Sequence, residues 1–322
     1  MIFSHLGKIK SEEDKEKNSL KIVADRLSTL LDREVYFIPK TRGKEVEEAF
    51  LHHSLILLEN TRFEDFPEKY ESASDETLSR YWASLGELFI NDAFGTTHRR
   101  HASNYGISKY LERGIGFLIK EEIEGLSPII KEVKRPFCVI MGGAKVDDKI
   151  ALIEELLKEC DALFVGGGIG NTFLKASGYE IGSSLYSKDY VIKIKELLDR
   201  YGKKVCMPMD VLVKRNDEAL VVSIKDVKKQ DCIYDIGAHT IEMYSKSLKD
   251  AHTIFLNGTM GLYEEEAYRQ GTLGLYQQLN EMKGKKIAGG GDAVASIKRL
   301  NMEKAFDFMS TGGGATLDYI VN

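Results

Sequence analysis

The sequence of 322 residues has no apolar run as long as the ~18–20 residues that cross a bilayer. Its first residues, MIFSHLGKIKSEEDKEKN, contain neither the apolar segment nor the small-residue cleavage site of a secretory signal peptide. Basic residues are not in excess, since 45 Lys and Arg stand against 50 Asp and Glu for a net charge of -5. We therefore expect a cytoplasmic protein that neither enters a membrane nor binds nucleic acid.

Closely spaced cysteines are also absent. The four cysteines, Cys138, Cys160, Cys206 and Cys232, are too far apart for zinc-binding pairs or for a C-x-x-C redox motif. Three of them lie in or beside apolar runs, so we interpret them as free, buried thiols of a reducing compartment.

Two common phosphate-binding signatures are missing. No segment matches G-x-x-x-x-G-K-[ST], and no glycine cluster completes G-x-G-x-x-G. The first absence excludes a P-loop protein, and the second weakens the case for a dinucleotide-binding fold.

Short apolar segments alternate with amphipathic ones along almost the whole chain. Apolar side chains at i, i+3 and i+4 predict helices between segments that have the pattern of strands. The predicted helices include 20–33, 44–53, 76–87, 149–160, 190–202 and 276–284. The predicted strands include 34–39, 54–60, 87–92, 137–141, 162–167, 204–210, 219–224, 253–258, 286–291 and 307–313. Such alternation is typical of α/β proteins in which helices cover both faces of a parallel sheet.

The length of 322 residues is typical of about two domains. Segment 116–136, GFLIKEEIEGLSPIIKEVKRP, has the pattern of one helix that ends before Pro136. We predict that it joins two domains. Residues 1–118 form the first domain, 119–134 the interdomain helix and 135–322 the second domain.

Glycine clusters follow several of the predicted strands. They occur at 142–143, 166–168, 289–291 and 312–314. In open α/β sheets ligands bind beyond the carboxyl ends of strands, where glycine lets backbone N–H groups approach phosphate oxygens. One such cluster is equally well explained as a tight turn, but four in one sheet favour an anion-binding site.

Charged residues near these glycines carry the candidate chemistry. Lys145 and Lys149 lie one helical turn apart after a strand and suit a polyphosphate, although solvated helix lysines are common. Asp292 directly follows the glycines 289–291, as either a helix cap or a ligand of nucleotide-bound Mg²⁺. Glu264 could accept ribose hydroxyls, or it could be a solvated glutamate.

Cations, rather than glycines, follow the predicted strands of the first half. They are His5 and Lys8, Arg62, and the segment THRRH at 97–101. Three strand ends that each carry a cation predict a pocket for a small, multiply charged acid, and a solvated basic rim is the alternative. No further metal ligands are grouped with the two histidines of THRRH, which disfavours a metal site.

In its motifs the sequence resembles the phosphoglycerate kinase family. The segments that carry the resemblance occur in family order: SHLGK, LLENTRF, INDAFGTTHRRHAS, MGGAKVDDKI, GGGIGNTFLKA, MPMDVLV, FLNGTMGLYEEEA, AGGGDAVA and STGGGATLDY. The resemblance implies an α/β fold with two doubly wound parallel-sheet domains around a cleft. It also implies a monomeric glycolytic enzyme that transfers a phosphoryl group between 1,3-bisphosphoglycerate and ADP, giving 3-phosphoglycerate and ATP.

The resemblance assigns roles to individual residues. It places His5, Lys8, Arg62 and Arg99 at the 3-phosphoglycerate, with Lys8 where the family usually has arginine. It places Asp292 at the Mg²⁺ of the nucleotide. It places Lys149, Gly290 and Gly313 at the phosphoryl group during transfer. The positions assigned to ATP or ADP are Gly142, Gly143, Lys145, Lys149, Gly167, Asn257, Glu264, Gly289, Gly290, Gly291, Asp292 and Ala293.

The sequence also departs from the family pattern. Thr259 replaces the usual proline, Ala293 a usual hydroxyl residue and Leu256 the usual tryptophan. Family members carry a segment before their SHLG motif, with a strand of the first domain's sheet, and a tail after STGGG. We therefore expect an incomplete first domain, and 322 residues that bind adenine nucleotide but show little or no kinase activity.

Two alternatives stay open at this point. One is a catalytically impaired, nucleotide-binding remnant of the same family, because the second domain is nearly complete and the first is not. The other, from spacing alone, is an NAD-dependent dehydrogenase.

Overall fold

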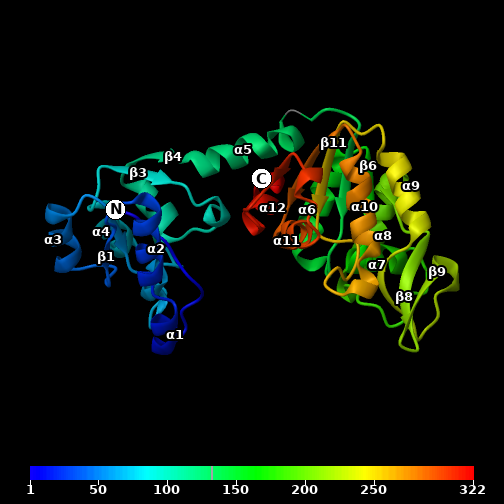
Figure 1. Cartoon of the computed structure of the whole chain (residues 1–322), viewed down its shortest axis with the longest axis horizontal. Helices are drawn as coiled ribbons and strands as arrows, with labels where there is room; N and C mark the ends of the chain where they lie inside the picture. The colour runs from blue at the N-terminus through cyan, green and yellow to red at the C-terminus, as the bar shows by residue number, and fades with distance from the viewer. Residues whose placement is uncertain (132) are drawn as a thin grey trace. The chain divides into compact units, whose positions relative to one another are not determined.

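The computed structural model describes residues 1–131 and 133–322. The chain forms two compact units, Met1–Ile119 and Lys120–Asn322, which we call unit 1 and unit 2 and describe separately (Figure 1). The division falls within α5 (Phe117–Ile130).

Unit 1 contains short helices and two separate pairs of parallel strands. Its elements are α1 (Glu12–Lys17), α2 (Lys21–Leu31), β1 (Tyr36–Ile38), α3 (Lys44–His52), β2 (Ile56–Leu58), α4 (Glu76–Ala83), β3 (Leu88–Asn91) and β4 (Glu112–Ile115). β1 pairs with β2, and β3 pairs with β4. An isolated parallel bridge between Ile2 and Leu57 adds the first residues of the chain to the β1–β2 pair.

Helix α4 provides much of the core of unit 1. It begins at Asp75, whose Oδ1 accepts a hydrogen bond from the Leu78 N–H (2.8 Å) and so satisfies one free donor of the first turn. Leu78 and Trp82, four residues apart, lie on one face of the helix and are both buried. The Trp82 Nε1–H donates to the Thr41 carbonyl oxygen (2.7 Å), so the buried indole keeps its hydrogen bond.

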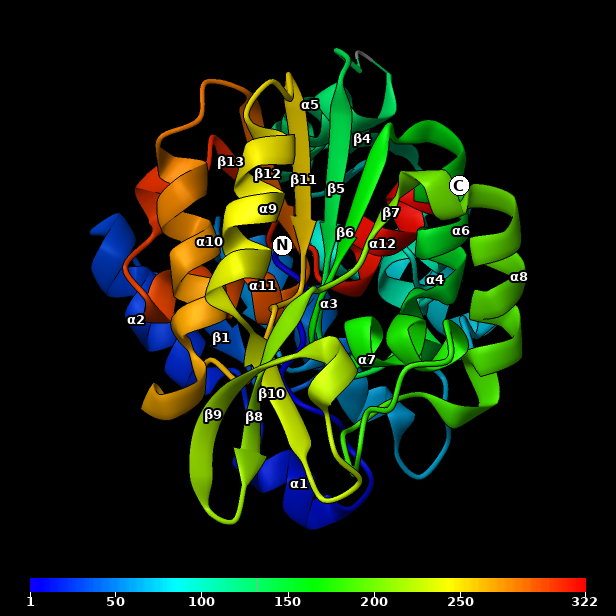
Figure 2. The ribbon, with the colours of Figure 1, turned by 90° about the vertical axis from the view of Figure 1, so that its right-hand side faces the viewer.

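Unit 2 contains a six-stranded parallel sheet in the order β13-β12-β11-β5-β6-β7 (Figure 2), which confirms the expected large parallel sheet. Its strands and helices are β5 (Phe137–Met141), α6 (Ile150–Glu159), β6 (Ala162–Val165), α7 (Gly167–Ala176), α8 (Val191–Tyr201), β7 (Val205–Cys206), β8 (Asp210–Arg215), β9 (Glu218–Ser223), β10 (Cys232–Ile236), α9 (Ala238–Leu248), β11 (Thr253–Asn257), α10 (Gln270–Asn280), β12 (Lys285–Gly289), α11 (Gly291–Arg299), β13 (Phe308–Met309) and α12 (Gly314–Val321).

The central strands of this sheet are buried on both faces. Every residue of β5 and of β11 is buried, as the continuous apolar runs predict. Ile140 of β5 packs in one core with Tyr244 of α9, Tyr276 of α10 and Ile297 of α11. Because side chains alternate along a strand, Val139 faces the opposite layer.

A second, antiparallel sheet in the order β10-β8-β9 corrects the sequence prediction of one strand over 204–210. β7 ends at Cys206 in the parallel sheet, and β8 begins at Asp210 in the antiparallel one. Asn216 and Asp217 connect β8 to β9 with φ values of 50° and 64°. Two consecutive residues with positive φ match the twist of a tight hairpin, so this Asn-Asp pair is the turn signal that the prediction missed.

Helix α5 ends at Ile130, earlier than the predicted end of the interdomain helix at residue 134. The Lys134 carbonyl oxygen accepts a hydrogen bond from the Thr253 Oγ1–H (2.9 Å). The Pro136 carbonyl accepts one from the His252 N–H (2.9 Å). These bonds tie residues 134 and 136 to the start of β11, in a segment that is not helical. Residue 132 lies outside the described residues.

Candidate active site

The carboxyl ends of β5, β6, β11 and β12 lie at one edge of the parallel sheet of unit 2. The glycines that follow them adopt conformations that other residues rarely take: φ is 108° at Gly143, 60° at Gly167 and 79° at Gly258. The Gly143 N–H donates to the Thr259 carbonyl oxygen (2.8 Å), which joins the loops after β5 and β11. The glycine clusters therefore bring several strand ends to one place.

A cavity of about 360 Å³ opens at this edge. Of the predicted nucleotide positions, Gly143, Gly167, Glu264 and Asp292 line it. The sequence analysis assigned no nucleotide contact to the rest of its lining: Ala144, Gly168, Asn171, Leu185, Ile233, Tyr234, Thr259, Gly261, Leu262 and Tyr263. The uncapped N-terminus of α7, at Gly167 and Gly168, lies beside an apolar and aromatic wall. This arrangement suits a nucleotide, because phosphates need donors and a base needs apolar surface.

Lys149 reaches the glycine loops from the residue before α6. Its Nζ donates to the Gly142 carbonyl oxygen (2.9 Å) and lies beside Gly258. Lys145 does not share a helix with it, because Lys145 lies in the loop before the short 3-10 turn Asp147–Lys149 and is exposed. The expectation of two ammonium groups one helical turn apart is therefore wrong, and of the two it is Lys149 that contacts the glycines.

Asn257 ends β11 and ties it to β12. Its Nδ2 donates to the Gly289 carbonyl oxygen (2.8 Å). Its Oδ1 is buried and has no hydrogen-bond partner among the described residues. Buried acceptors without a partner are rare in proteins. This oxygen is thus positioned at the strand ends as a hydrogen-bond acceptor for a bound group.

Gly290 and Gly313 occupy the positions just before α11 and α12. Their φ values are 95° and 55°, and neither helix has a side-chain cap at its N-terminus. Uncapped first-turn N–H groups leave a helix end suited to an anion. Gly291 begins α11, while Ala293 in its first turn is fully buried.

Asp292 is the second residue of α11, and the cap position belongs to Gly290. The alternative that Asp292 is a helix cap is therefore wrong. Burial raises the pKa of the Tyr263 hydroxyl, and the negative charges of Glu264 and Asp292 raise it further. Two carboxylates and one phenol thus converge on the cavity. Among the described residues, no group of three or more His, Cys, Asp or Glu side chains could hold a metal ion.

Asp235 lies behind this wall of the cavity, with its carboxyl almost fully buried at the start of α10. Its Oδ2 accepts from the Gly271 N–H (2.5 Å), and its Oδ1 accepts from the Ile236 N–H (2.9 Å). Burial raises the pKa of this carboxyl to about 7, although the N–H donors oppose the shift. The ordinary value is 3.8, so the folded state disfavours the charged form.

We expect Asp235 to make the stability of unit 2 depend on pH. A pKa raised in the folded state gives stability that is present near pH 4 and lost as pH rises through about 7. As pH rises from about 4 to about 7, the free energy of unfolding of the parent chain should fall by up to about 4 kcal/mol relative to that of Asp235→Asn, which cannot ionise. This follows from 1.36 kcal/mol per pKa unit. Urea unfolding followed by far-UV circular dichroism measures the difference, and a difference that is constant with pH contradicts the prediction.

Cationic side chains of unit 1 gather around His5. Partial burial of the His5 imidazole lowers its pKa, and the charges of Arg62, Arg99 and His101 lower it further. The Arg62 Nη1–H donates to the Gly7 carbonyl oxygen (2.8 Å), whereas its Nε is buried without a hydrogen-bond partner among the described residues. Three of the four predicted acid-binding residues are therefore brought together, with one guanidinium nitrogen unused.

His101 joins this cluster, although the residue assignments from the sequence did not include it. Its Nδ1 lies 3.7 Å from Glu71 Oε1, and Glu71 is buried. Burial lowers the pKa of His101, and the charge of Arg62 lowers it further. The basic segment THRRH, residues 97–101, is the feature of the sequence that could have identified His101. Lys8, in contrast, is an exposed side chain on the loop that follows His5.

Comparison with known proteins gives one consistent result. The family profile described as phosphoglycerate kinase matches residues 1–322. The phosphoglycerate kinase of Staphylococcus carnosus (strain TM300) is 48% identical over 328 residues, which cover 99% of this chain and 83% of that protein. That of Staphylococcus haemolyticus (strain JCSC1435) is 46% identical with the same coverage.

Solved structures agree with the sequence relatives. The structure of phosphoglycerate kinase from Coxiella burnetii matches with a TM-score of 0.87 and 34% identity, over 99% of this chain and 82% of that one. That of phosphoglycerate kinase from Pyrococcus horikoshii OT3 matches with a TM-score of 0.82 and 29% identity over the same shares.

Proposed function

Because the chain belongs to the phosphoglycerate kinase family, we propose that its two units divide the substrates of that reaction between them. The reaction is phosphoryl transfer between 1,3-bisphosphoglycerate and ADP, which gives 3-phosphoglycerate and ATP in glycolysis. Residues 135–322 bind the nucleotide, residues 1–118 bind the phosphoglycerate, and residues 119–134 connect them. The family match contradicts the dehydrogenase alternative.

The cavity at the glycine loops carries the nucleotide assignment. Gly143 and Gly167 donate their own N–H groups to the Thr259 and Met260 carbonyls, but without side chains they let the phosphates approach the uncapped N-terminus of α7. Tyr234 and Leu262 offer apolar surface to the base. Glu264 accepts from the ribose hydroxyls at the exposed end. The complete proposed set is Gly142, Gly143, Lys145, Lys149, Gly167, Asn257, Glu264, Gly289, Gly290, Gly291, Asp292 and Ala293.

The residues present also fit a Mg²⁺ ion bound with the nucleotide. Mg²⁺ in kinase sites is held by one or two carboxylates together with phosphate oxygens and water. Asp292 places one carboxylate in the cavity lining, and the described residues around it offer no complete cage. Bound Mg²⁺ supplies positive charge that offsets the phosphate oxygens, and we assign to Asp292 the role of holding it there.

The cationic cluster of unit 1 supports binding of 3-phosphoglycerate. The charges of Arg62 and Arg99 act on His5, and the Arg62 Nε is buried without a hydrogen-bond partner among the described residues. A guanidinium with an unused donor can bind a carboxylate or phosphate in a forked arrangement. Lys8 adds a mobile point charge beside them, where a lysine gives no such fork.

The reaction needs charge and position rather than a base. The carboxylate of 3-phosphoglycerate is already ionised at pH 7, so no group has to remove a proton from it. Lys149 can transfer its hydrogen bond from the Gly142 carbonyl to a phosphoryl oxygen as negative charge develops there. The helix ends after Gly290 and Gly313 supply N–H groups for the same purpose.

Asp292→Asn tests the metal assignment. We expect the variant to bind ADP with Mg²⁺ about tenfold or more weakly, since a neutral amide replaces the charged ligand, while metal-free ADP binds as in the parent. Calorimetric titration with and without Mg²⁺ measures both affinities. Asp250→Asn, an exposed aspartate outside the cavity, is the control. Equal losses with and without Mg²⁺ would assign Asp292 to helix stability instead.

We also propose that the protein acts as a cytoplasmic monomer that does not bind nucleic acid. The net charge of -5 disfavours attraction to a polyanion. Among the described helices, none has the length and apolar character to cross a membrane.

A further inference from the structure

One wall of the cavity at the glycine loops is the short segment 261–264, which we call the wall segment. All four of its residues line the cavity. The wall segment follows β11 and precedes the 3-10 turn Glu266–Tyr268, and it belongs to no helix or strand. Its shape is therefore fixed by contacts with other parts of unit 2 rather than by a regular hydrogen-bond pattern of its own.

Hydrogen bonds from three other places in unit 2 hold the backbone of the wall segment. The Leu262 N–H donates to the Tyr234 carbonyl oxygen of β10 (2.8 Å). The Gly261 carbonyl oxygen accepts from the Thr259 Oγ1–H (3.0 Å). The Gly261 N–H donates to Thr272 Oγ1 in the first turn of α10 (3.2 Å), and Thr272 is fully buried. The link to α10 thus depends on one buried hydroxyl group.

The carboxyl group of Asp235 lies between the wall segment and α10. A Cβ atom at Gly261 would lie 2.3 Å from Asp235 Oδ1, and so would one at Gly271. The carboxyl therefore packs directly against both backbones. Its Oδ2 accepts from the Gly271 N–H (2.5 Å), and the Thr272 N–H adds a further hydrogen bond to the same carboxyl. Asp235 thus fixes the start of α10 and, with it, the position of the Thr272 hydroxyl.

We propose that Asp235 and Thr272 are positioning residues for the nucleotide. Asp235 holds the first turn of α10, and the Thr272 hydroxyl holds the wall segment where Leu262 and Glu264 can contact the base and the ribose. The inference rests on the nucleotide site proposed above, and it adds two residues that are not among the described residues lining the cavity. Contacts held in place before binding raise affinity, because less freedom is lost when the nucleotide binds.

A pair of variants at Thr272 tests the hydroxyl. Thr272→Val keeps the shape of the side chain but leaves the Gly261 N–H without its acceptor. We expect it to bind ADP with Mg²⁺ about threefold to tenfold more weakly than the parent, the scale for one hydrogen bond. Thr272→Ser keeps the oxygen and should bind within about twofold of the parent. Packing of the methyl group alone would give the opposite order, with valine the better replacement.

Thr253→Val is the matched control. Thr253 is also a buried threonine of unit 2, and its hydroxyl donates to the Lys134 carbonyl oxygen (2.9 Å) at the start of β11, whereas the cavity opens at the other end of the strand. Calorimetric titration should show parent-like ADP affinity in this variant. Equal affinity in the parent and Thr272→Val, or a loss that Thr272→Ser or Thr253→Val shares, would overturn the proposal. A parent chain that does not bind ADP would contradict the proposed function as well.

Asp235→Asn tests the carboxyl. An amide offers one acceptor oxygen where the carboxyl offers two, so the N–H of either Gly271 or Ile236 loses its partner. We expect ADP affinity to fall about threefold to tenfold. Because both residues act through the wall segment, Asp235→Asn combined with Thr272→Val should bind no more than about twofold more weakly than the weaker single variant. Losses that multiply in full would show that the two residues act independently.

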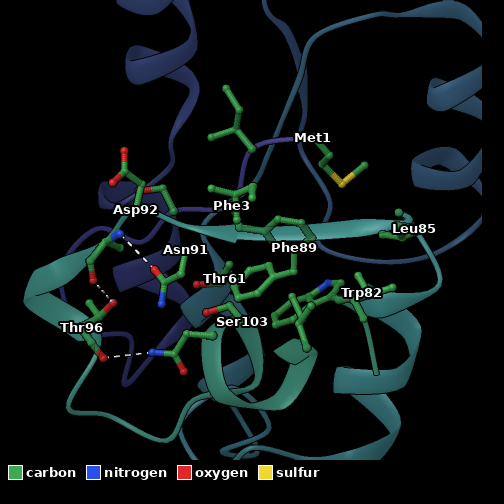
Figure 3. A pocket seen from close by; sticks show the side chains of 18 of the residues that line it. Met1, Phe3, Thr61, Trp82, Leu85, Phe89, Asn91, Asp92, Thr96 and Ser103 are labelled. Atoms are coloured by element: carbon green, nitrogen blue, oxygen red, sulfur yellow. Dashed lines mark hydrogen bonds between the residues drawn. The ribbon is translucent and has the colours of Figure 1, made fainter. Parts of the chain in front are cut away.

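Amide hydrogen exchange locates the effect within the chain. Exchange at Gly261 and Leu262 should be faster in Thr272→Val than in the parent, while exchange at Phe255 in β11 stays the same. Trp82, the single tryptophan, lies in unit 1 beside Phe3 and Phe89 (Figure 3), so unchanged fluorescence shows that unit 1 is folded as in the parent. Faster exchange at Phe255 as well would indicate general destabilisation of unit 2 and contradict a positioning role.

Discussion

Gly142→Ala is expected to disrupt the nucleotide site of unit 2. A Cβ atom at position 142 would lie 2.1 Å from the Thr259 carbonyl oxygen and 2.6 Å from the Thr259 carbonyl carbon. These are backbone atoms of the loop after β11, which itself bonds to Gly143, so no side-chain rotation relieves the contact. The two loops must separate, and overpacking of this kind costs about 1–3 kcal/mol or more.

We expect this separation to weaken binding of ADP with Mg²⁺ by about 10- to 100-fold, since each tenfold change corresponds to ~1.4 kcal/mol. Calorimetric titration measures the affinity, and urea unfolding followed by circular dichroism measures the stability. Gly202→Ala is the matched control, because a Cβ there meets nothing within 4 Å and the backbone is already helical. Unchanged affinity in Gly142→Ala would show that the close contact of the loops does not shape the site.

Lys149→Ala is expected to lower kcat by roughly 10²–10³, the scale for losing one preorganised group that stabilises transition-state charge. The Lys149 Nζ donates to the Gly142 carbonyl oxygen, so its charge is held at the glycine loops. An interaction that strengthens only in the transition state affects kcat more than substrate binding. The KM for nucleotide should therefore change little.

Because we expect the 322 residues alone to show little or no kinase activity, the coupled assay compares parent and variant in a version that also carries the family's segment before SHLG. Lys158→Ala, which removes an exposed lysine from the far end of α6, is the control for a simple change of net charge. Calorimetry with ADP and Mg²⁺ should show similar affinity in all three chains. A large rise in KM with normal kcat would assign Lys149 to ground-state binding instead.

The local elements of this protein follow from its sequence. Apolar residues in unbroken runs predicted β5 and β11, and their side chains are buried on both faces of the sheet. Amphipathic spacing predicted α2, α3 and α8 to within one or two residues of their observed ends. Glycines after strands predicted the edge at which the cavity opens, because glycine takes the positive φ of these turns more readily than any other residue.

The sequence predicted the chemistry of the candidate sites better than their geometry. Gly143, Gly167, Glu264 and Asp292 do line one cavity, although they come from segments far apart in the chain. Tyr263 belongs to the same wall but lies in a segment whose pattern indicates only a loop. An aromatic loop residue acquires a role when tertiary contacts place it beside a ligand site, and no local spacing encodes this.

Only the tertiary structure decided which strand ends meet and where local patterns stop. The apolar segment 219–224 has the pattern of a strand, but its antiparallel pairing depends on β8 and on the turn at Asn216 and Asp217. The pattern of α5 continues beyond Ile130, yet the Lys134 carbonyl bonds to Thr253, more than a hundred residues away. Local periodicity sets the preference of each segment through its own backbone and side chains. Strand order, helix ends and buried partners such as Asn257 with Gly289 depend on contacts between distant residues, and these form only when the whole unit packs.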